Sequence, residues 1–263
     1  MNARALRFLV FTSGFCLMLL QIVSSRALAP HLGTSIYTWT NIIATTLLGI
    51  LIGNYLGGLV SQKFSDKKTF ALTFIAAGSA TLLSIFLVTI VEDLLGNVSL
   101  HLAIKTAIYT FIIFFPAAAC LAAILPQAFR LDLQDLKHAG TRFGSLYAWS
   151  SFGNVLGLML GGFVLISLMG TKQVLLAIAA LLVATGLYIG RGHALWKSRV
   201  SLLVAAFFLG AILLPSYCQE ETNYYCIRVT SVTDDETGAQ SYVLKLDHLV
   251  HSYVRPGDVA VLG

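Results

Sequence analysis

The sequence predicts an all-α membrane protein with about seven transmembrane helices, followed by a short tail that forms a β-hairpin. Of the 263 residues, 57% are hydrophobic and only 11% are charged, and the mean hydropathy is +0.82. A soluble domain usually has about 25% charged residues, so the composition excludes a soluble protein. Apolar runs near the roughly 20 residues that a helix needs to cross a bilayer recur along most of the chain. The lipid bilayer is therefore its expected environment.

The predicted spans divide the chain into two parts. Arg4 and Arg7 precede the first apolar run as in a signal peptide, but the length of the run and the absence of a small-residue cleavage pattern before Arg26 favour a retained helix. The runs cover about residues 6–28, 36–60, 69–91, 104–126, 143–168, 173–190 and 199–215. We therefore expect a transmembrane domain over residues 1–215 and a β-strand tail over residues 216–263.

The distribution of lysine and arginine predicts the orientation, because basic residues that flank membrane spans stay in the cytoplasm. Three of the six loops hold only Arg26, Lys105 and Lys172. The N-terminus and the other three loops hold Arg4, Arg7, Lys63, Lys67, Lys68, Arg130, Lys137, Arg142, Arg191, Lys197 and Arg199. This asymmetry predicts a cytoplasmic N-terminus in a bacterial inner membrane and, after seven crossings, an exoplasmic tail. The net charge of +5 then requires no nucleic acid partner.

Two glycine-rich segments repeat the same spacing at an offset of 104 residues. They are LGILIGNYLGG, residues 48–58, and FGNVLGLMLGG, residues 152–162. Glycine every four residues lets a neighbouring helix approach closely. The glycines predicted to pack are Gly49, Gly53, Gly57, Gly153, Gly157 and Gly161. Since the offset pairs the second span with the fifth, we expect spans one to three and four to six to form an inverted 3+3 repeat, as in many transporters. Coincidence is the alternative, because glycine is frequent in membrane helices.

Amide side chains lie within several of the predicted spans. Gln21, Asn41, Asn54 and Asn154 are expected to form hydrogen bonds between helices, or else to line a substrate path. No ionisable residue is predicted near the middle of the membrane. This pattern argues against a proton-coupled transporter.

The loop after the second span, GLVSQKFSDKK at residues 58–68, resembles the GxxxDRxGRRK signature of the major facilitator superfamily. Gln62 stands in place of the aspartate, whereas Lys63, Lys67 and Lys68 keep the basic pattern. A simple cytoplasmic basic loop would have the same charges.

A closer resemblance is carried by SGFCLMLLQIVSSRALAPHLGTSIYTW (13–39), by GSLYAWSSFGNVLGLMLGGFVLISLMG (144–170) and by the tail segments ETNYYCIRV and LKLDHLVHSYV. Together they resemble the membrane-bound spermidine synthase-like family. The resemblance implies a facilitator-like helical region, then a small β domain and a Rossmann-like domain that binds decarboxylated S-adenosylmethionine. Gln21 replaces the family's glutamate before Arg26, and both residues are candidate ligand contacts.

The tail contains two runs that favour β-strands, NYYCIRVTSV and QSYVLKLDHLVHSYV, joined by the turn DDETG. A third strand could extend from His248 to Val254. A lone hairpin is marginally stable, so we expect a protein partner, such as a separate catalytic chain, to cover it. Asp247 and His251 occupy positions where the resemblance implies LDGxxQ, a segment that lines the nucleoside and amine pocket. Solvated side chains on an exposed strand are the alternative.

The tail has no glycine-rich turn between a strand and a helix, so we predict no nucleotide cofactor. No catalytic residue can be assigned, and the 263-residue chain by itself is not expected to be an enzyme. No His, Cys or acidic residues have metal-ligand spacing. Cys16 and Cys120 lie in spans as packing residues, whereas Cys218 and Cys226 could form a disulfide outside the cell.

Two functions follow from these features. The first is a membrane anchor, docking or binding module of a spermidine synthase-like system. The second is a half-size facilitator-like carrier or flippase subunit, which the predicted repeat and the basic loop favour. The first has a topological difficulty, because the aminopropyl donor is cytosolic and the tail is predicted to be exoplasmic.

Overall fold

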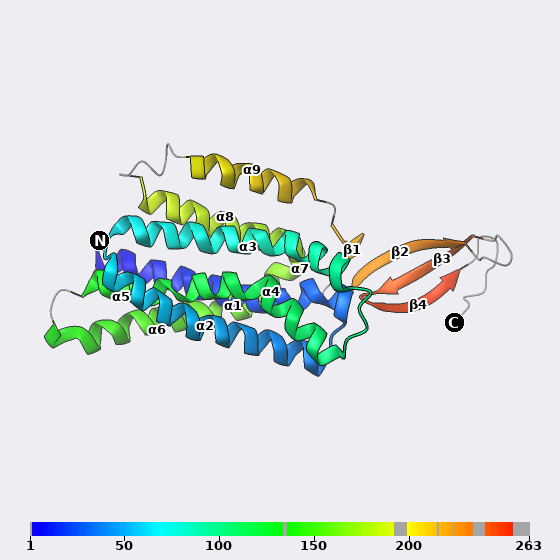
Figure 1. The fold of residues 1–263 in the computed structure, drawn as a ribbon, viewed down its shortest axis with the longest axis horizontal. Coiled ribbons are helices and arrows are strands. Elements are labelled where there is room, and N and C mark those ends of the chain that lie inside the picture. Colours follow the sequence, from blue (N-terminus) through cyan, green and yellow to red (C-terminus); the bar gives the residue numbers. More distant parts are fainter. Residues whose placement is uncertain are drawn as a thin grey trace.

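The structure is a bundle of long helices with a small β-sheet at one end (Figure 1). It is a computed structural model, and it describes residues 2–133, 136–191, 199–214, 216–222, 224–233 and 240–254. Within these ranges, six helices are long enough and apolar enough to cross a membrane. The structure thus fits an integral membrane protein and places the sheet at the end of the bundle opposite the N-terminus.

The six spans follow the predicted order, and two of them are interrupted. The helices are α1 (Ala3–Leu32), α2 (Ile36–Lys63), α3 (Lys67–Leu95), α4 (Leu102–Ala122), α5 (Ile124–Asp132), α6 (Ala139–Leu160), α7 (Ile166–Met169) and α8 (Thr171–Ile189). The fourth span consists of α4 and α5. The fifth consists of α6, a π-helical turn over Gly161–Leu165, and α7.

The predicted seventh span is not confirmed. Helix α9 covers Arg199–Leu213, only 15 residues, fewer than the roughly 20 that a membrane crossing needs. Its first turn follows residues 192–198, which lie outside the described part of the chain. Helix α9 packs on α3 through the rings of Phe207 and Phe86, whose centroids are 4.6 Å apart. It runs beside the bundle toward the end that carries the sheet (Figure 1).

Side-chain caps start two of the spans. Ser35 Oγ accepts a hydrogen bond from the Thr38 backbone N–H at 3.2 Å at the start of α2. Asp66 Oδ1 accepts one from the Thr69 backbone N–H at 3.2 Å at the start of α3. Each cap satisfies an N–H group that has no partner within the helix. Asp66 belongs to the basic loop signature, so this loop also has a local structural role.

The two glycine ladders form close contacts between helices. On α2, a Cβ at Gly49 would lie 2.7 Å from Ala118 Cβ of α4, and one at Gly53 would overlap the Ala119 carbonyl oxygen. On α6, a Cβ at Gly157 would overlap the Phe15 carbonyl oxygen of α1. Gly57 is similarly crowded by the residue that precedes α5. On the fifth span, α1 crowds Gly153 and Gly161 in the same way. We call these two contacts the glycine seams.

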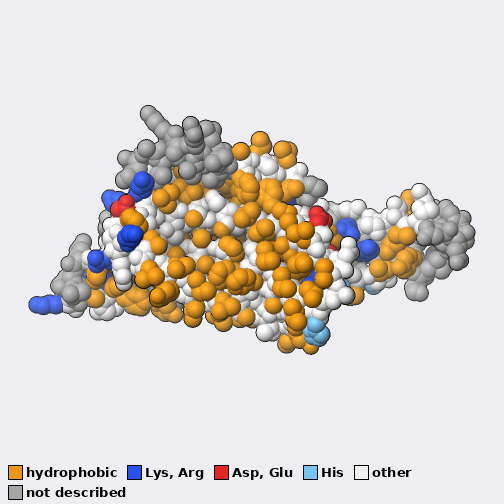
Figure 2. Space-filling view, viewed as in Figure 1, with side chains coloured by type: hydrophobic (Ala, Val, Ile, Leu, Met, Phe, Trp, Pro, Cys, Tyr) orange, Lys and Arg blue, Asp and Glu red, His pale blue; other side chains and the backbone are white. Residues whose placement is uncertain are grey.

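Apolar side chains cover the visible side of the bundle, and charged side chains gather toward its two ends (Figure 2). Leu51, Tyr55 and Phe163 are among the large exposed side chains on α2 and on the π-helical turn. Gly58 and Gly162, which directly follow the last glycine of each ladder, have no atom within 4 Å of an added Cβ. These two glycines therefore lie outside the seams.

The tail forms a four-stranded antiparallel sheet with the order β1-β2-β3-β4. The strands are β1 (Glu220–Glu221), β2 (Cys226–Thr233), β3 (Gln240–Leu246) and β4 (Leu249–Val254). The predicted hairpin and its third strand are both present, and the register pairs Ile227 with Leu246. The predicted DDETG turn lies outside the described residues. Strand β1 was not predicted, because two residues are too short to form a pattern.

Candidate functional site

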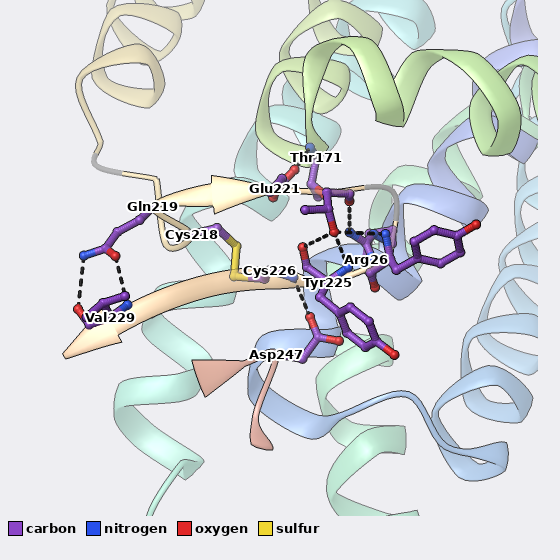
Figure 3. The surroundings of a disulfide bond; sticks show 11 residues. Arg26, Thr171, Cys218, Gln219, Glu221, Tyr225, Cys226, Val229 and Asp247 are labelled. Atoms are coloured by element: carbon purple, nitrogen blue, oxygen red, sulfur yellow. Dashed lines mark hydrogen bonds between the residues drawn. A yellow bond between two sulfur atoms is a disulfide. The ribbon is translucent and has the colours of Figure 1, made fainter. Parts of the chain in front are cut away.

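Arg26 links the first membrane helix to the tail. Its Nη2 donates a hydrogen bond to the Thr222 carbonyl oxygen at 2.8 Å, and its Nη1 donates to the Tyr224 carbonyl oxygen. Both acceptors lie between β1 and β2, so one guanidinium contacts two residues of this connection (Figure 3). Arg26, predicted as a ligand contact, thus has a structural role as well.

Glu221 of β1 forms a second link, to the start of α8. Its Oε2 accepts a hydrogen bond from the Thr171 backbone N–H at 2.5 Å. A carboxylate is favourable there because the N-terminus of a helix carries partial positive charge. Gly170 precedes the helix with a φ of 76°, and a Cβ at this position would lie only 2.8 Å from Glu221 Oε2. Both the backbone angle and the close carboxylate favour glycine.

A disulfide and a carboxylate fix the start of β2 (Figure 3). Cys218 and Cys226 are joined by a disulfide, with their Cα atoms 5.4 Å apart. Asp247 lies in the turn between β3 and β4 with a φ of 53°. Its Oδ1 accepts a hydrogen bond from the Cys226 N–H, and its own N–H donates to the Cys226 carbonyl oxygen, both at 2.9 Å. Asp247 therefore connects the turn between β3 and β4 to the start of β2.

A polar cluster lies beside these links at the same end of the bundle. His31, whose side chain is only 2% exposed, has Nδ1 3.4 Å from Glu92 Oε2. The same oxygen accepts a hydrogen bond from the Tyr109 hydroxyl at 2.9 Å. The Tyr217 ring lies 4.4 Å from the His31 ring, and the Arg228 guanidinium lies 4.3 Å above Tyr217. The cluster joins three membrane helices to the tail.

A pocket opens between the bundle and the tail, and we call it the junction pocket. Its apolar part is lined by Ala27, Pro30, Ile85, Val88, Leu175 and Leu214. Its polar part includes Arg26, His31, Thr171, Lys172 and Glu221. Arg26 Nε and Thr171 Oγ1 are buried polar atoms without a hydrogen-bond partner among the described residues. The pocket is thus amphipathic, with two donor groups available.

The other predicted site residues are not brought together there. Gln21 lies half-buried in α1, and His251 is exposed on β4. Lys63, Lys67 and Lys68 are exposed beside Asp66, where α2 ends and α3 begins. The candidate residues therefore belong to separate parts of the molecule.

The polar residues predicted between helices have different surroundings. Asn41 Nδ2 donates hydrogen bonds to the Ala103 carbonyl oxygen at 3.0 Å and to Thr106 Oγ1 at 2.5 Å, which joins α2 to α4. Asn154 lies in the second glycine seam, where its Oδ1 is buried and has no hydrogen-bond partner among the described residues. Asn54 is half-buried on α2.

Sequence reasoning did not single out His31, Glu92, Tyr109, Thr171 or Glu221. These residues are far apart in the chain and belong to no recognisable motif. Glu92 gave one usable signal, because an acidic residue in the last turn of a long apolar helix is costly without a partner. The described residues contain no group of three or more His, Cys, Asp or Glu that could hold a metal ion.

Comparison with protein-family models, with curated proteins and with solved structures finds no match to this chain. The resemblance to the spermidine synthase-like family therefore stays a prediction from the quoted sequence segments.

Proposed function

We propose that this chain is the membrane anchor and docking module of a spermidine synthase-like system. The observation that carries the proposal is a difference between the two edges of the sheet. The β1 edge is hydrogen-bonded to the bundle, whereas β4 has an unpaired backbone edge among the described strands and contacts the bundle through the preceding His248 ring, which lies against Gly33. The β1 edge is attached to the bundle through Glu221 and the Arg26 contacts. Strand β4 pairs only with β3 among the described strands.

The free edge has the properties of a docking strand. An unpaired strand edge offers backbone N–H and C=O groups to a further strand. On β4, Leu249 is 62% exposed and Tyr253 is 45% exposed. These apolar side chains gain stability if a partner covers them. Attachment at the other edge keeps the sheet in one orientation, which lowers the entropic cost of binding.

The resemblance in the tail supports a catalytic chain of the aminopropyltransferase type as the partner. Aminopropyl transfer needs a donor site, an amine site and a base held in one geometry. One oxygen of Asp247, the only tail carboxylate in the LDGxxQ-like segment, already accepts the Cys226 N–H. We therefore expect the purified chain to show no transfer from decarboxylated S-adenosylmethionine to putrescine. Turnover that disappears in Asp247→Ala would contradict this.

Photo-crosslinking tests the docking proposal. Tyr253 of β4 is replaced in cells by p-benzoylphenylalanine, and Tyr55 on the apolar face of α2 is the matched control. We expect Tyr253, and not Tyr55, to yield a protein adduct that mass spectrometry identifies as an aminopropyltransferase-type chain. Adducts with lipid alone, or with the same proteins from both positions, would contradict the proposal.

The basic residues support an orientation with the N-terminus in the cytoplasm of a bacterial cell. The sheet, at the opposite end of the bundle, would then be exoplasmic, which requires the segment that contains α9 to cross the membrane as well. After mild reduction, Cys218 and Cys226 should react with an impermeant thiol reagent on intact cells. Labelling only after lysis would place the sheet in the cytoplasm, where the aminopropyl donor is made.

The alternative function, a half-size facilitator-like carrier or flippase subunit, is favoured by the packing pairs. Helix α2 packs on α4, and α6 packs on α1. If spans one, two and three correspond to spans four, five and six, the pair of α2 and α4 corresponds to the pair of α6 and α1. The pair of α3 and α8 then corresponds to itself. Such correspondence is expected of an inverted 3+3 repeat. Substrate-dependent flux of a labelled polyamine into proteoliposomes would favour the carrier, and its absence would oppose it.

A further inference from the structure

We propose that the junction pocket binds a phosphate-bearing anionic lipid, with its headgroup at the polar part and its chains along the apolar part. This inference is independent of the docking function, because it concerns a surface between α1, α3, α8 and the tail and not the free edge of β4.

The order of apolar and polar residues along the pocket indicates an amphipathic ligand. Ala27 and Pro30 of α1, Ile85 and Val88 of α3, and Leu175 of α8 line the pocket within the apolar bundle. The polar residues of the pocket lie where α1 ends and α8 begins, next to the tail. A lipid presents the same order, with acyl chains in the membrane and a charged group at its surface.

The polar part favours an anion that accepts hydrogen bonds. Arg26 and Lys172 are cations. Glu221 is the one acidic residue among the described lining residues, and Glu92 lies next to the pocket behind His31. The Glu221 carboxylate is already bound to the Thr171 N–H. The first turn of α8, a helix of 19 residues, adds partial positive charge. Hydrogen-bond donors of Arg26, Thr171 and Lys172 therefore favour a ligand that accepts hydrogen bonds, such as a phosphate.

Buried donors remain for that phosphate. Arg26 donates from both terminal nitrogens to tail carbonyls, whereas its buried Nε–H and Thr171 Oγ1 have no partner among the described residues. A buried donor without a partner is costly, so a ligand that accepts from both is stabilised. Lys172 Nζ donates to the Ile212 oxygen at 3.2 Å and to the Leu214 oxygen, and its third hydrogen is available.

The test is a titration of the full purified chain in detergent with dioctanoyl phosphatidylglycerol, followed by thermal shift. Lys172→Met should weaken the apparent affinity about tenfold or more, because a hydrogen bond to a charged group is worth about 1.5–3 kcal/mol. The matched control is Lys105→Met at the same end of the bundle. Lys105 Nζ also donates to a carbonyl oxygen, that of Gly96, at 2.7 Å, but it does not line the pocket. We expect no change for this control.

Thr171→Val keeps the size of the side chain and breaks no hydrogen bond among the described residues, so it should fold. We expect it to lower the affinity for the lipid several-fold. Equal affinities for the wild type, Lys172→Met and Thr171→Val would overturn the proposal. Equal affinity for zwitterionic phosphatidylcholine would overturn the charge argument.

A last pair of probes separates the sources of the anion. Inorganic phosphate alone should stabilise the wild type far less than the lipid does at equal concentration. If it stabilises the protein equally, and Thr171→Val removes that effect, the pocket is a free phosphate site and the lipid assignment is wrong. Stabilisation by spermidine in place of the lipid would also overturn the assignment.

Discussion

The two glycine seams and the junction between bundle and sheet hold the molecule together by different means. In the seams, Gly53 and Gly157 bring helix backbones into contact through absence of a side chain. At the junction, Arg26 and Glu221 bridge elements that share little apolar surface, and a disulfide secures β2. The seams should therefore be sensitive to added volume and insensitive to reduction. The junction should respond in the opposite way.

The largest effect is expected from filling a seam. Gly53→Leu and Gly157→Leu place a side chain against a carbonyl oxygen of the neighbouring helix. Overpacking typically costs about 1–3 kcal/mol and more where backbone must move, so the yield of folded protein and its melting temperature should fall. Gly58→Leu and Gly162→Leu are matched controls on the same helical segments, with open space around the added Cβ. Similar losses at all four positions would show that the seams are not specific contacts.

The disulfide should give the next largest effect. Replacing Cys218 and Cys226 by serine removes a covalent cross-link between residues with a sequence separation of 8. Removing a disulfide typically costs about 2–4 kcal/mol, and less for a short loop such as this one. We expect the tail to become sensitive to limited proteolysis while the melting temperature of the helices stays the same. Loss of helical stability to the same degree would show that the two regions unfold together.

The smallest effect concerns the cap of α3, at the end of the bundle far from the junction. Hydrogen bonding from Thr69 holds the pKa of the Asp66 carboxyl below its ordinary value. Asp66→Ala should cost about 1 kcal/mol at neutral pH. A lowered folded-state pKa means that this stabilisation is present above the unfolded pKa and is lost as the pH falls through the folded pKa.

The gap in stability between the wild type and Asp66→Ala should therefore narrow in acid. Ser35→Ala is the matched control, because Ser35 caps α2 through a hydrogen bond of the same 3.2 Å length and does not titrate. A gap for Asp66→Ala that is as large at acidic as at neutral pH would contradict the account.

The sequence predicts most of the bundle because membrane helices follow from local composition. Six spans and the seam glycines could be located from apolar length and four-residue spacing alone. The seventh span could not be judged in this way, because α9 has 15 described residues and follows residues 192–198, which lie outside the described part of the chain. Gly58 and Gly162 lie off the four-residue spacing, and the space around them is open, as the spacing predicts.

The candidate site was largely hidden in the sequence. Arg26 and Asp247 were singled out through a resemblance, and both prove to bond across long separations to the tail backbone. Glu221 and Thr171 are 50 residues apart in the sequence and meet only because α8 begins where the tail docks. Such pairs depend on tertiary structure, which residue patterns along the chain do not encode directly.

Hydrogen exchange on the full chain, read by mass spectrometry, tests most directly whether the sheet is attached at β1 and free at β4. We expect slow exchange across β2 and β3, and fast exchange in β4. A reductant should accelerate exchange in β2 and leave α2 and α6 unchanged. Slow exchange throughout β4 in the isolated chain, or acceleration of all elements together on reduction, would contradict the account.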